Sequence, residues 1–153
     1  MSYTIIYGIK KGKKSISLAS FQNSRGFGIV TWTPYFKVYL NKDPFKRIME
    51  EEDYDELWPL YNDNRLPYHQ KVVLQATYDH SMIPVEKLDI FTNSLDKWQE
   101  DFSHLIEGKV NHVPDISNYI KDNMKKLKKY DYIGIQTTDI VENQYDINWN
   151  RSF

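Results

Sequence analysis

The sequence predicts an α+β fold in which four to five helices pack against a small, mainly antiparallel sheet. Residues 3–9 and 16–21 are two runs of strand-forming side chains around a short glycine-containing turn, which is the pattern of a β-hairpin. A third strand-like run covers residues 130–138. Between these runs, residues 85–106 place large apolar side chains at alternating steps of three and four, the period of an amphipathic helix.

Length and composition predict one globular domain over residues 1–153, without an internal repeat or linker. A chain of this size buries roughly two-thirds of its unfolded surface. The formal net charge of −1 lacks the basic excess of a nucleic-acid-binding domain, so no nucleic-acid partner is expected. The absence of cysteine excludes disulfides and thiolate catalysis. With neither a signal-peptide pattern nor a long apolar run, we expect a cytoplasmic protein without a membrane partner.

Prolines that follow a capping residue predict where several helices begin. Thr33 and Pro34 would open one helix, and Asp43 and Pro44 would open the next. Pro114 would open a later helix with lysines toward its C-terminal end, where the helix dipole favours cations. The first of these helices would present one apolar stripe, made of Trp32, Phe36, Tyr39 and Leu40.

Residues 50–56 form a dense acidic run, and like charges at this density predict that the helix weakens or breaks there. The run is either a solvated face or a docking surface for a basic partner. The acidic residues of the predicted docking surface are Glu50, Glu51, Glu52, Asp53, Asp55 and Glu56. The lysines at positions 10, 11, 13 and 14 also allow two interpretations, of which a solvated hairpin tip is favoured over a phosphate contact.

The apolar stretch 72–78 is expected to cross the core, although its period fits a helix and a strand equally well. Because prolines precede the other predicted helices, we favour a helix over residues 67–77, followed by a short extended segment at 81–83. The long helix that follows is predicted to bury Leu88, Phe91, Leu95, Trp98, Phe102 and Leu105.

No motif for catalysis, metal or cofactor binding is present, so we expect neither metal nor cofactor and favour a protein that is not an enzyme. The four histidines show no pair at the spacing of a helical metal site. Asp79, His80 and Ser81 bring together the residue types of a hydrolase, but sequence neighbours point in different directions.

A candidate binding site combines polar segments that follow three core elements, with an aromatic wall. If the hairpin and the last strand share one sheet, two of these segments would meet at its edge. Amides, hydroxyls, one guanidinium and an indole suit recognition more than reaction. The alternative is that they are caps and turns. The candidate residues are Asn23, Arg25, Trp32, Asp79, His80, Gln136, Thr137 and Thr138.

These patterns lead to three hypotheses about function. The first is an intracellular binding protein that neutralises another protein, as toxin-immunity or phage counter-defence proteins do. It depends on the small size, the aromatic share of 15% and the separate acidic run. The second is a small-molecule or nucleotide-like ligand binder that uses Arg25, the lysines and aromatic stacking on Trp32 or a tyrosine. The third, and least favoured, is a hydrolase that works through Asp79 and His80.

Overall fold

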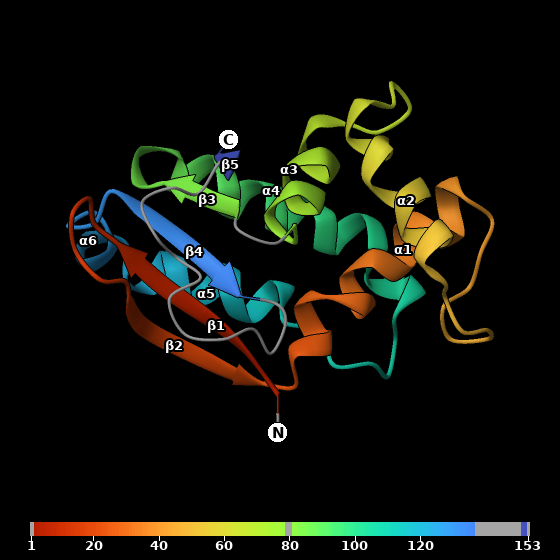
Figure 1. The fold of residues 1–153 in the computed structure, drawn as a ribbon, viewed down its shortest axis with the longest axis horizontal. Coiled ribbons are helices and arrows are strands. Elements are labelled where there is room, and N and C mark those ends of the chain that lie inside the picture. Colours follow the sequence, from red (N-terminus) through yellow and green to blue (C-terminus); the bar gives the residue numbers. More distant parts are fainter. Residues whose placement is uncertain (1, 79–80, 137–150, 153) are drawn as a thin grey trace.

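A five-stranded sheet organises the computed structural model, which describes residues 2–78, 81–136 and 151–152 (Figure 1). Strand β1 pairs antiparallel with β2 on one side and with β4 on the other, and β4 pairs antiparallel with β3. The last strand, β5, pairs parallel with β3. The predicted α+β class, with a small antiparallel sheet, is confirmed. In spatial order the strands are β2 (Ile16–Gln22), β1 (Tyr3–Ile9), β4 (Tyr132–Gln136), β3 (Ser81–Pro84) and β5 (Arg151–Ser152).

Strand β1 lies between the two strands that the sequence predicted to join it. It forms the hairpin with β2, with a register shift between Ile6 and Tyr7. On its other edge it pairs with β4, where Ile6 lies opposite Ile135. Both isoleucines are buried in the core, as is Ile133. The hairpin and the C-terminal strand therefore share one sheet, as predicted.

The helices form a layer against one face of the sheet and extend beyond its end (Figure 1). Helices α4 and α5 lie behind the sheet, whereas α1 and α2 lie at the end away from the β1–β2 turn. Within the described residues, none of the helices combines the length and apolar character needed to cross a bilayer. The helices are α1 (Ile29–Tyr39), α2 (Glu51–Leu57), α3 (Tyr68–Ala76), α4 (Leu88–Phe102), α5 (Val113–Asp122) and α6 (Met124–Leu127).

Helix α4 supplies the centre of the core, and its predicted apolar stripe is confirmed. Leu88, Phe91, Leu95 and Trp98 are inaccessible to solvent, and the helix packs against α3 and α5. Side chains of this size contribute on the order of 10 kcal/mol when buried together, before conformational entropy opposes them. The helix is shorter than predicted because both ends tighten into 3₁₀ turns, and Leu105 in the second turn is only half-buried.

Residues 72–76 of the stretch expected to cross the core are helical, so the preference for a helix over residues 67–77 is confirmed by α3, which spans Tyr68–Ala76. Val72, Val73 and Leu74 are all buried, because the helix lies between α4 and the rest of the core. The short extended segment after it is also confirmed, and it becomes the fully buried strand β3.

The predicted start of the first helix is wrong. Helix α1 begins at Ile29, and Pro34 lies inside it. Proline removes one backbone donor from a helix interior. Burial of Pro34 together with Tyr35 and Phe36 in the core outweighs that cost. Thr33 is not a cap: its hydroxyl donates to the carbonyl oxygen of Ile29 at 2.7 Å.

The predicted helix at Asp43 and Pro44 is absent as well, and the chain forms a turn there. The Asp43 carboxylate accepts from the backbone N–H of Phe45 at 3.0 Å, a local bond that competes with helix formation. The apolar residue Ile48 that follows is 89% exposed, so its side chain adds no buried surface that would favour a helix here.

The prediction that a helix weakens or breaks at the acidic run is wrong, because the run itself forms helix α2. The side chain of Glu50 accepts from the backbone of Asp53, and the Asp53 carboxylate accepts from the backbone N–H of Glu50 at 2.7 Å. The Asp53 carboxylate also forms salt bridges with Lys42 Nζ at 2.6 Å and with Arg47 Nη2 at 2.7 Å. Carboxylates in a first helical turn are favoured by the helix dipole. Cations from outside the run and a capping box thus overcome the repulsion.

Acidification is expected to destabilise the wild type more than an Asp53→Asn variant. The N–H of Glu50 and the ammonium of Lys42 hold the pKa of Asp53 below its ordinary value of 3.8. Folding lowers the pKa of Asp53, so the ionised carboxylate stabilises the folded state fully above pH 3.8. This stabilisation is lost as the pH falls through the lowered pKa. Denaturant midpoints measured from pH 5 to pH 2 test this, and parallel profiles for the two proteins would contradict it.

Candidate functional site

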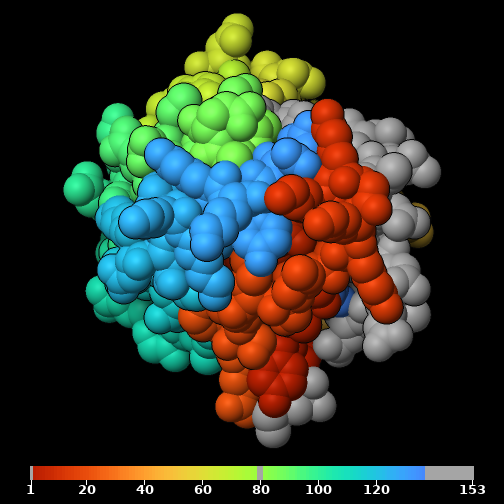
Figure 2. All heavy atoms as spheres, turned by 90° about the vertical axis from the view of Figure 1, so that its left-hand side faces the viewer, coloured from red at the N-terminus to blue at the C-terminus, as the bar shows by residue number. Residues whose placement is uncertain are grey.

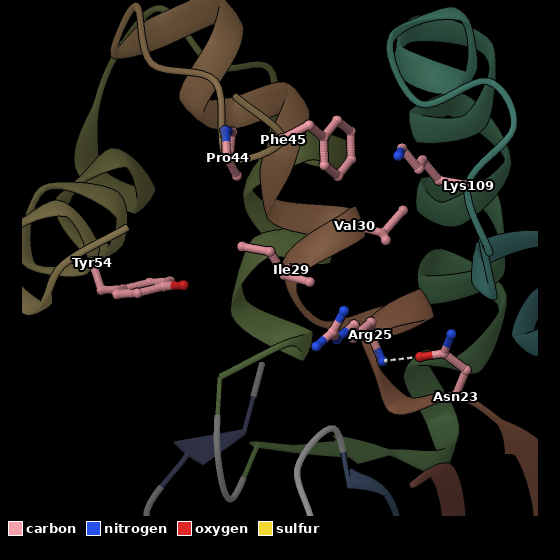
Figure 3. A pocket seen from close by; sticks show the side chains of 8 residues that line it. All are labelled: Asn23, Arg25, Ile29, Val30, Pro44, Phe45, Tyr54 and Lys109. Carbon is pink, nitrogen blue, oxygen red and sulfur yellow. Dashed lines mark hydrogen bonds between the residues drawn. The ribbon is translucent and has the colours of Figure 1, made fainter. Parts of the chain in front are cut away.

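An open cavity of about 480 Å³ lies where four segments of the chain meet (Figure 3). The segments are the turn after β2 with the start of α1, the loop between α1 and α2, helix α2 itself, and the loop after α4. The volume falls within the range of small-molecule sites. The lining residues are Asn23, Arg25, Ile29, Val30, Pro44, Phe45, Tyr54 and Lys109.

A tight turn after β2 places two of the sequence-predicted residues in this cavity. Asn23 adopts a positive φ of 75°, and its side-chain oxygen accepts from the backbone N–H of Arg25 at 3.2 Å. Asparagine tolerates this conformation better than most residues. The N–H of Asn23 donates to the carbonyl oxygen of Ser2 at 2.8 Å, which ties the turn to the start of β1. The side chain of Arg25 therefore leaves from a fixed backbone.

Buried His112 holds the same turn from the other side. Its Nε2 lies 2.8 Å from the carbonyl oxygen of Gln22 and 2.9 Å from that of Asn23. Its Nδ1 lies 3.0 Å from the Asp115 carboxylate at the start of α5. The His112 ring therefore contacts oxygen atoms on both sides and connects β2, the turn and α5.

The cavity has a positive and partly aromatic lining. Arg25 and Lys109 are its two cationic residues, and none of its eight lining residues carries a carboxylate. The Nζ of Lys109 lies 4.4 Å from the centre of the Phe45 ring, and that of Lys37 lies 5.2 Å from it. These are cation–π distances. Phe45 lines the cavity and is 37% exposed.

Tyr54 adds a hydroxyl to this lining. Figure 3 shows the phenol group pointing inward from α2, opposite Lys109 and with Ile29 and Val30 between them. Burial raises the pKa of Tyr54, and the negative charge of Asp53 raises it further. The hydroxyl therefore keeps its proton at neutral pH and remains a hydrogen-bond donor.

Trp32, predicted as an aromatic wall, stands behind the cavity rather than in its lining. Its ring packs edge-on against Tyr54, with the ring centres 5.7 Å apart. Its Nε1 donates to the Thr77 hydroxyl at 2.8 Å. Trp32 therefore supports the position of Tyr54 and joins α1 to the end of α3.

Only part of the predicted convergence falls on described residues. Asn23 follows β2, and Gln136 ends β4, so both lie at the same end of the sheet on either side of β1. Gln136 is buried, accepts from the Tyr7 hydroxyl at 3.1 Å and does not line the cavity. Asp79, His80, Thr137 and Thr138 lie outside the described residues, and their predicted roles remain predictions.

The acidic run contributes less free charge than its sequence indicates. Asp53 is buried and paired with two cations, and Glu56 binds Lys42 at 2.6 Å. Glu50 caps the helix. Within the acidic run, the exposed carboxylates that form no ion pair are Glu50, Glu51, Glu52 and Asp55.

A separate polar cluster joins α3 to α4. The Asp101 carboxylate lies 2.5 Å from His69 Nε2 and accepts from Gln70 Nε2 at 3.0 Å. Burial would raise the pKa of Asp101, but the hydrogen bonds from His69 and Gln70 outweigh it and lower the pKa overall. Tyr39 donates to Gln70 at 2.5 Å. Throughout the described part of the chain, no group of three histidine, aspartate or glutamate residues is placed to hold a metal ion.

Sequence reasoning found Asn23 and Arg25 but missed the aromatic and cationic residues that complete the cavity. Tyr54 was hidden inside the acidic run, and Phe45 belonged to a helix that does not form. Lys109, which follows Gly108 after α4, carried no distinguishing signal. Comparison of this chain with protein-family models, with curated proteins and with solved structures found no match, so the geometry of the cavity alone carries the functional argument.

Proposed function

We propose that this protein is a binding protein for a small anionic molecule that also carries a flat ring, as nucleotides do. The single observation behind the proposal is a cavity of about 480 Å³ that combines two cations with an aromatic ring and lacks a carboxylate in its lining. Arg25 presents a planar fork that suits phosphate or carboxylate groups. Lys109 adds a point charge, and Phe45 offers a face for stacking.

Several features favour binding over catalysis at this cavity. General acid–base chemistry usually employs a histidine or a carboxylate within reach of the substrate. The lining contains neither, and its hydroxyl, on Tyr54, has a raised pKa that keeps it protonated. His112 is close in sequence to Lys109, but its ring nitrogens face the backbone of β2 and Asp115. These groups can hold a ligand, and they lack the proton acceptor that bond cleavage needs.

A nucleotide panel is expected to contain at least one ligand that raises the melting temperature by roughly 5–10 °C at 100 times its Kd. Such an excess adds about 2.7 kcal/mol to the free energy of unfolding, and about 1 kcal/mol shifts the midpoint of a domain of this size by 2–4 °C. Replacing Arg25 with Gln should weaken binding by roughly 10–100-fold, because it removes a charge-assisted hydrogen bond. Isothermal calorimetry measures both the affinity and the loss.

Lys46→Gln serves as the matched control, since Lys46 is an exposed cation in the same loop as Phe45 but does not line the cavity. It should leave the ligand affinity unchanged. Absence of any stabilising nucleotide or related anion, or equal losses in the Arg25 and Lys46 variants, would contradict the proposal.

A second candidate, an intracellular protein that neutralises a protein partner, is supported by the surface next to α2. Ile48 is 89% exposed and lies three residues before Glu51, which is exposed like Glu52 and Asp55. An apolar residue beside a cluster of one charge sign suits a partner with a basic surface.

This second candidate is tested by comparing the proteins recovered with wild type and with an Ile48→Ser, Glu52→Gln, Asp55→Asn variant. A stoichiometric partner that is recovered only with wild type supports it. Recovery of the same proteins with both baits would count against it, because the altered residues are exposed and their substitution leaves the core intact.

A further inference from the structure

Eight lysines from two distant segments gather at one end of the molecule. Four occupy the turn between β1 and β2, and four lie in and just after helix α6, and all eight are exposed. We name this surface the lysine pole. Its members are Lys10, Lys11, Lys13, Lys14, Lys125, Lys126, Lys128 and Lys129.

Backbone hydrogen bonds hold the two segments side by side. The N–H of Lys11 donates to the Asp131 carboxylate at 2.8 Å, and the N–H of Asp131 donates to the carbonyl oxygen of Ile9 at 2.9 Å. The Tyr130 ring lies so close to Gly8 that an added Cβ would be 2.6 Å from it. Figure 2 looks onto this end and shows the red hairpin beside the blue segment that contains α6 and β4.

Among the described residues, the two segments that carry the lysine pole contain few carboxylates to neutralise it. Residues 1–42 contain seven lysines and arginines and not one aspartate or glutamate. In the segment 122–136 the acidic residues are Asp122 and Asp131, and one oxygen of Asp131 already accepts from the backbone N–H of Lys11. The acidic helix α2 lies at the opposite end of the molecule (Figure 1). The formal net charge of −1 therefore conceals a segregation of charge that composition alone does not reveal.

The composition of the pole favours a polyanion over the other partners of basic surfaces. Stable membrane association usually adds apolar side chains that enter the bilayer to the attraction of cations for lipid headgroups. Among the described residues of the β1–β2 hairpin and of α6, Ile16 is the one large apolar side chain that is mainly exposed, while Leu127 is buried. Lysine is also depleted in protein–protein interfaces. Clustered lysines are instead effective contacts for regularly spaced phosphates.

The geometry points to the lysine pole as a sequence-independent binding surface for the phosphodiester backbone of a nucleic acid. This surface is separate from the cavity, because the cavity begins at Asn23, beyond the far end of β2. The length of β2 places the two sites roughly 20 Å apart.

Fluorescence anisotropy with labelled 20-nucleotide single-stranded and duplex DNA tests this inference. We expect saturable binding in the micromolar range at about 50 mM salt. If six lysines each neutralise one phosphate, the affinity for duplex falls by about 10³-fold between 50 and 200 mM salt. Random sequences and a fixed sequence should bind equally well.

Paired variants locate the surface. Lys11→Gln with Lys13→Gln, and separately Lys126→Gln with Lys128→Gln, should each reduce the slope of log affinity against log salt by about 2. Asp131→Asn removes the carboxylate between the two groups and should strengthen binding by up to about fivefold at low salt. The control pair Lys46→Gln with Lys97→Gln alters two exposed lysines on other elements and should leave the slope unchanged.

Three results would overturn the inference. One is an absence of saturable binding to either DNA at 50 mM salt. Another is the same salt slope in wild type and in both pole variants. The third is stronger binding to vesicles that contain phosphatidylserine than to DNA, which would assign the pole to a membrane surface. Circular dichroism of each variant confirms that it is folded. None of these readouts depends on the ligand of the cavity.

Discussion

Replacing Trp98 with alanine is expected to lower the free energy of unfolding by about 3–5 kcal/mol. Trp98 is completely buried on α4, the helix that packs against both α3 and α5. Its ring packs edge-on against the Phe102 ring, with the ring centres 5.6 Å apart. The Phe102 ring in turn packs edge-on against Tyr35 of α1 at the same centre-to-centre distance. Truncation removes the largest side chain in this chain of aromatic contacts and leaves a cavity that its neighbours fill only in part. Chemical denaturation followed by circular dichroism measures the loss.

Two variants on the same helix serve as controls for this prediction. Trp98→Phe keeps most of the ring volume and should cost clearly less than Trp98→Ala. Ile90→Ala alters an apolar side chain of α4 that is 45% exposed, and should change stability by less than about 1 kcal/mol. A loss for Trp98→Ala as small as that for Ile90→Ala would show that α4 is not the centre of the core.

Replacing Gly26 with alanine is expected to lower the free energy of unfolding by about 1–3 kcal/mol, although it adds a single methyl group. An ideal Cβ at Gly26 would lie 2.3 Å from Cδ2 of His112. The ring has little freedom to retreat, because it is bound to Asp115 and to two carbonyl oxygens of the turn. Its displacement would also move Asn23 and Arg25, so we expect weaker ligand binding as well. Denaturation and calorimetry measure the two effects.

A double-mutant cycle separates this clash from a general sensitivity of the turn. In a His112→Ala background the ring is gone, so the added methyl group of Gly26→Ala should cost less than it does in wild type. Equal costs in both backgrounds would show that the close approach to His112 is not the cause.

The sequence predicted best those elements whose signal is local and repeated. The apolar stripe of α4 and the two runs around the glycine turn of the hairpin depend on side chains that are near one another in sequence. Helix α2 was predicted wrongly because the cations that neutralise it, Lys42 and Arg47, lie outside the acidic run. Pro34 misled the prediction for α1 because a capping pattern carries no information about tertiary burial.

The candidate site was predictable only in the turn that holds Asn23 and Arg25, where the residue types themselves favour an irregular backbone. The rest depends on the folding of four segments toward one cavity, and a single sequence contains no measure of that proximity. The lysine pole shows the same limit. Each lysine group on its own fits a solvated end, and only the pairing of β1 with β4 brings the two groups together.

The position of β1 has a consequence for the order in which the protein folds. Its two neighbours come from opposite ends of the chain, since Ile6 faces Ala19 on one side and Ile135 on the other. During synthesis, the β1–β2 hairpin leaves the ribosome early, and the edge of β1 that pairs with β4 stays unpaired until residues 132–136 have emerged. Contacts of such wide sequence separation slow folding, and an unpaired strand edge favours aggregation. Yield of native protein should therefore depend on how quickly translation reaches the end of β4, at residue 136.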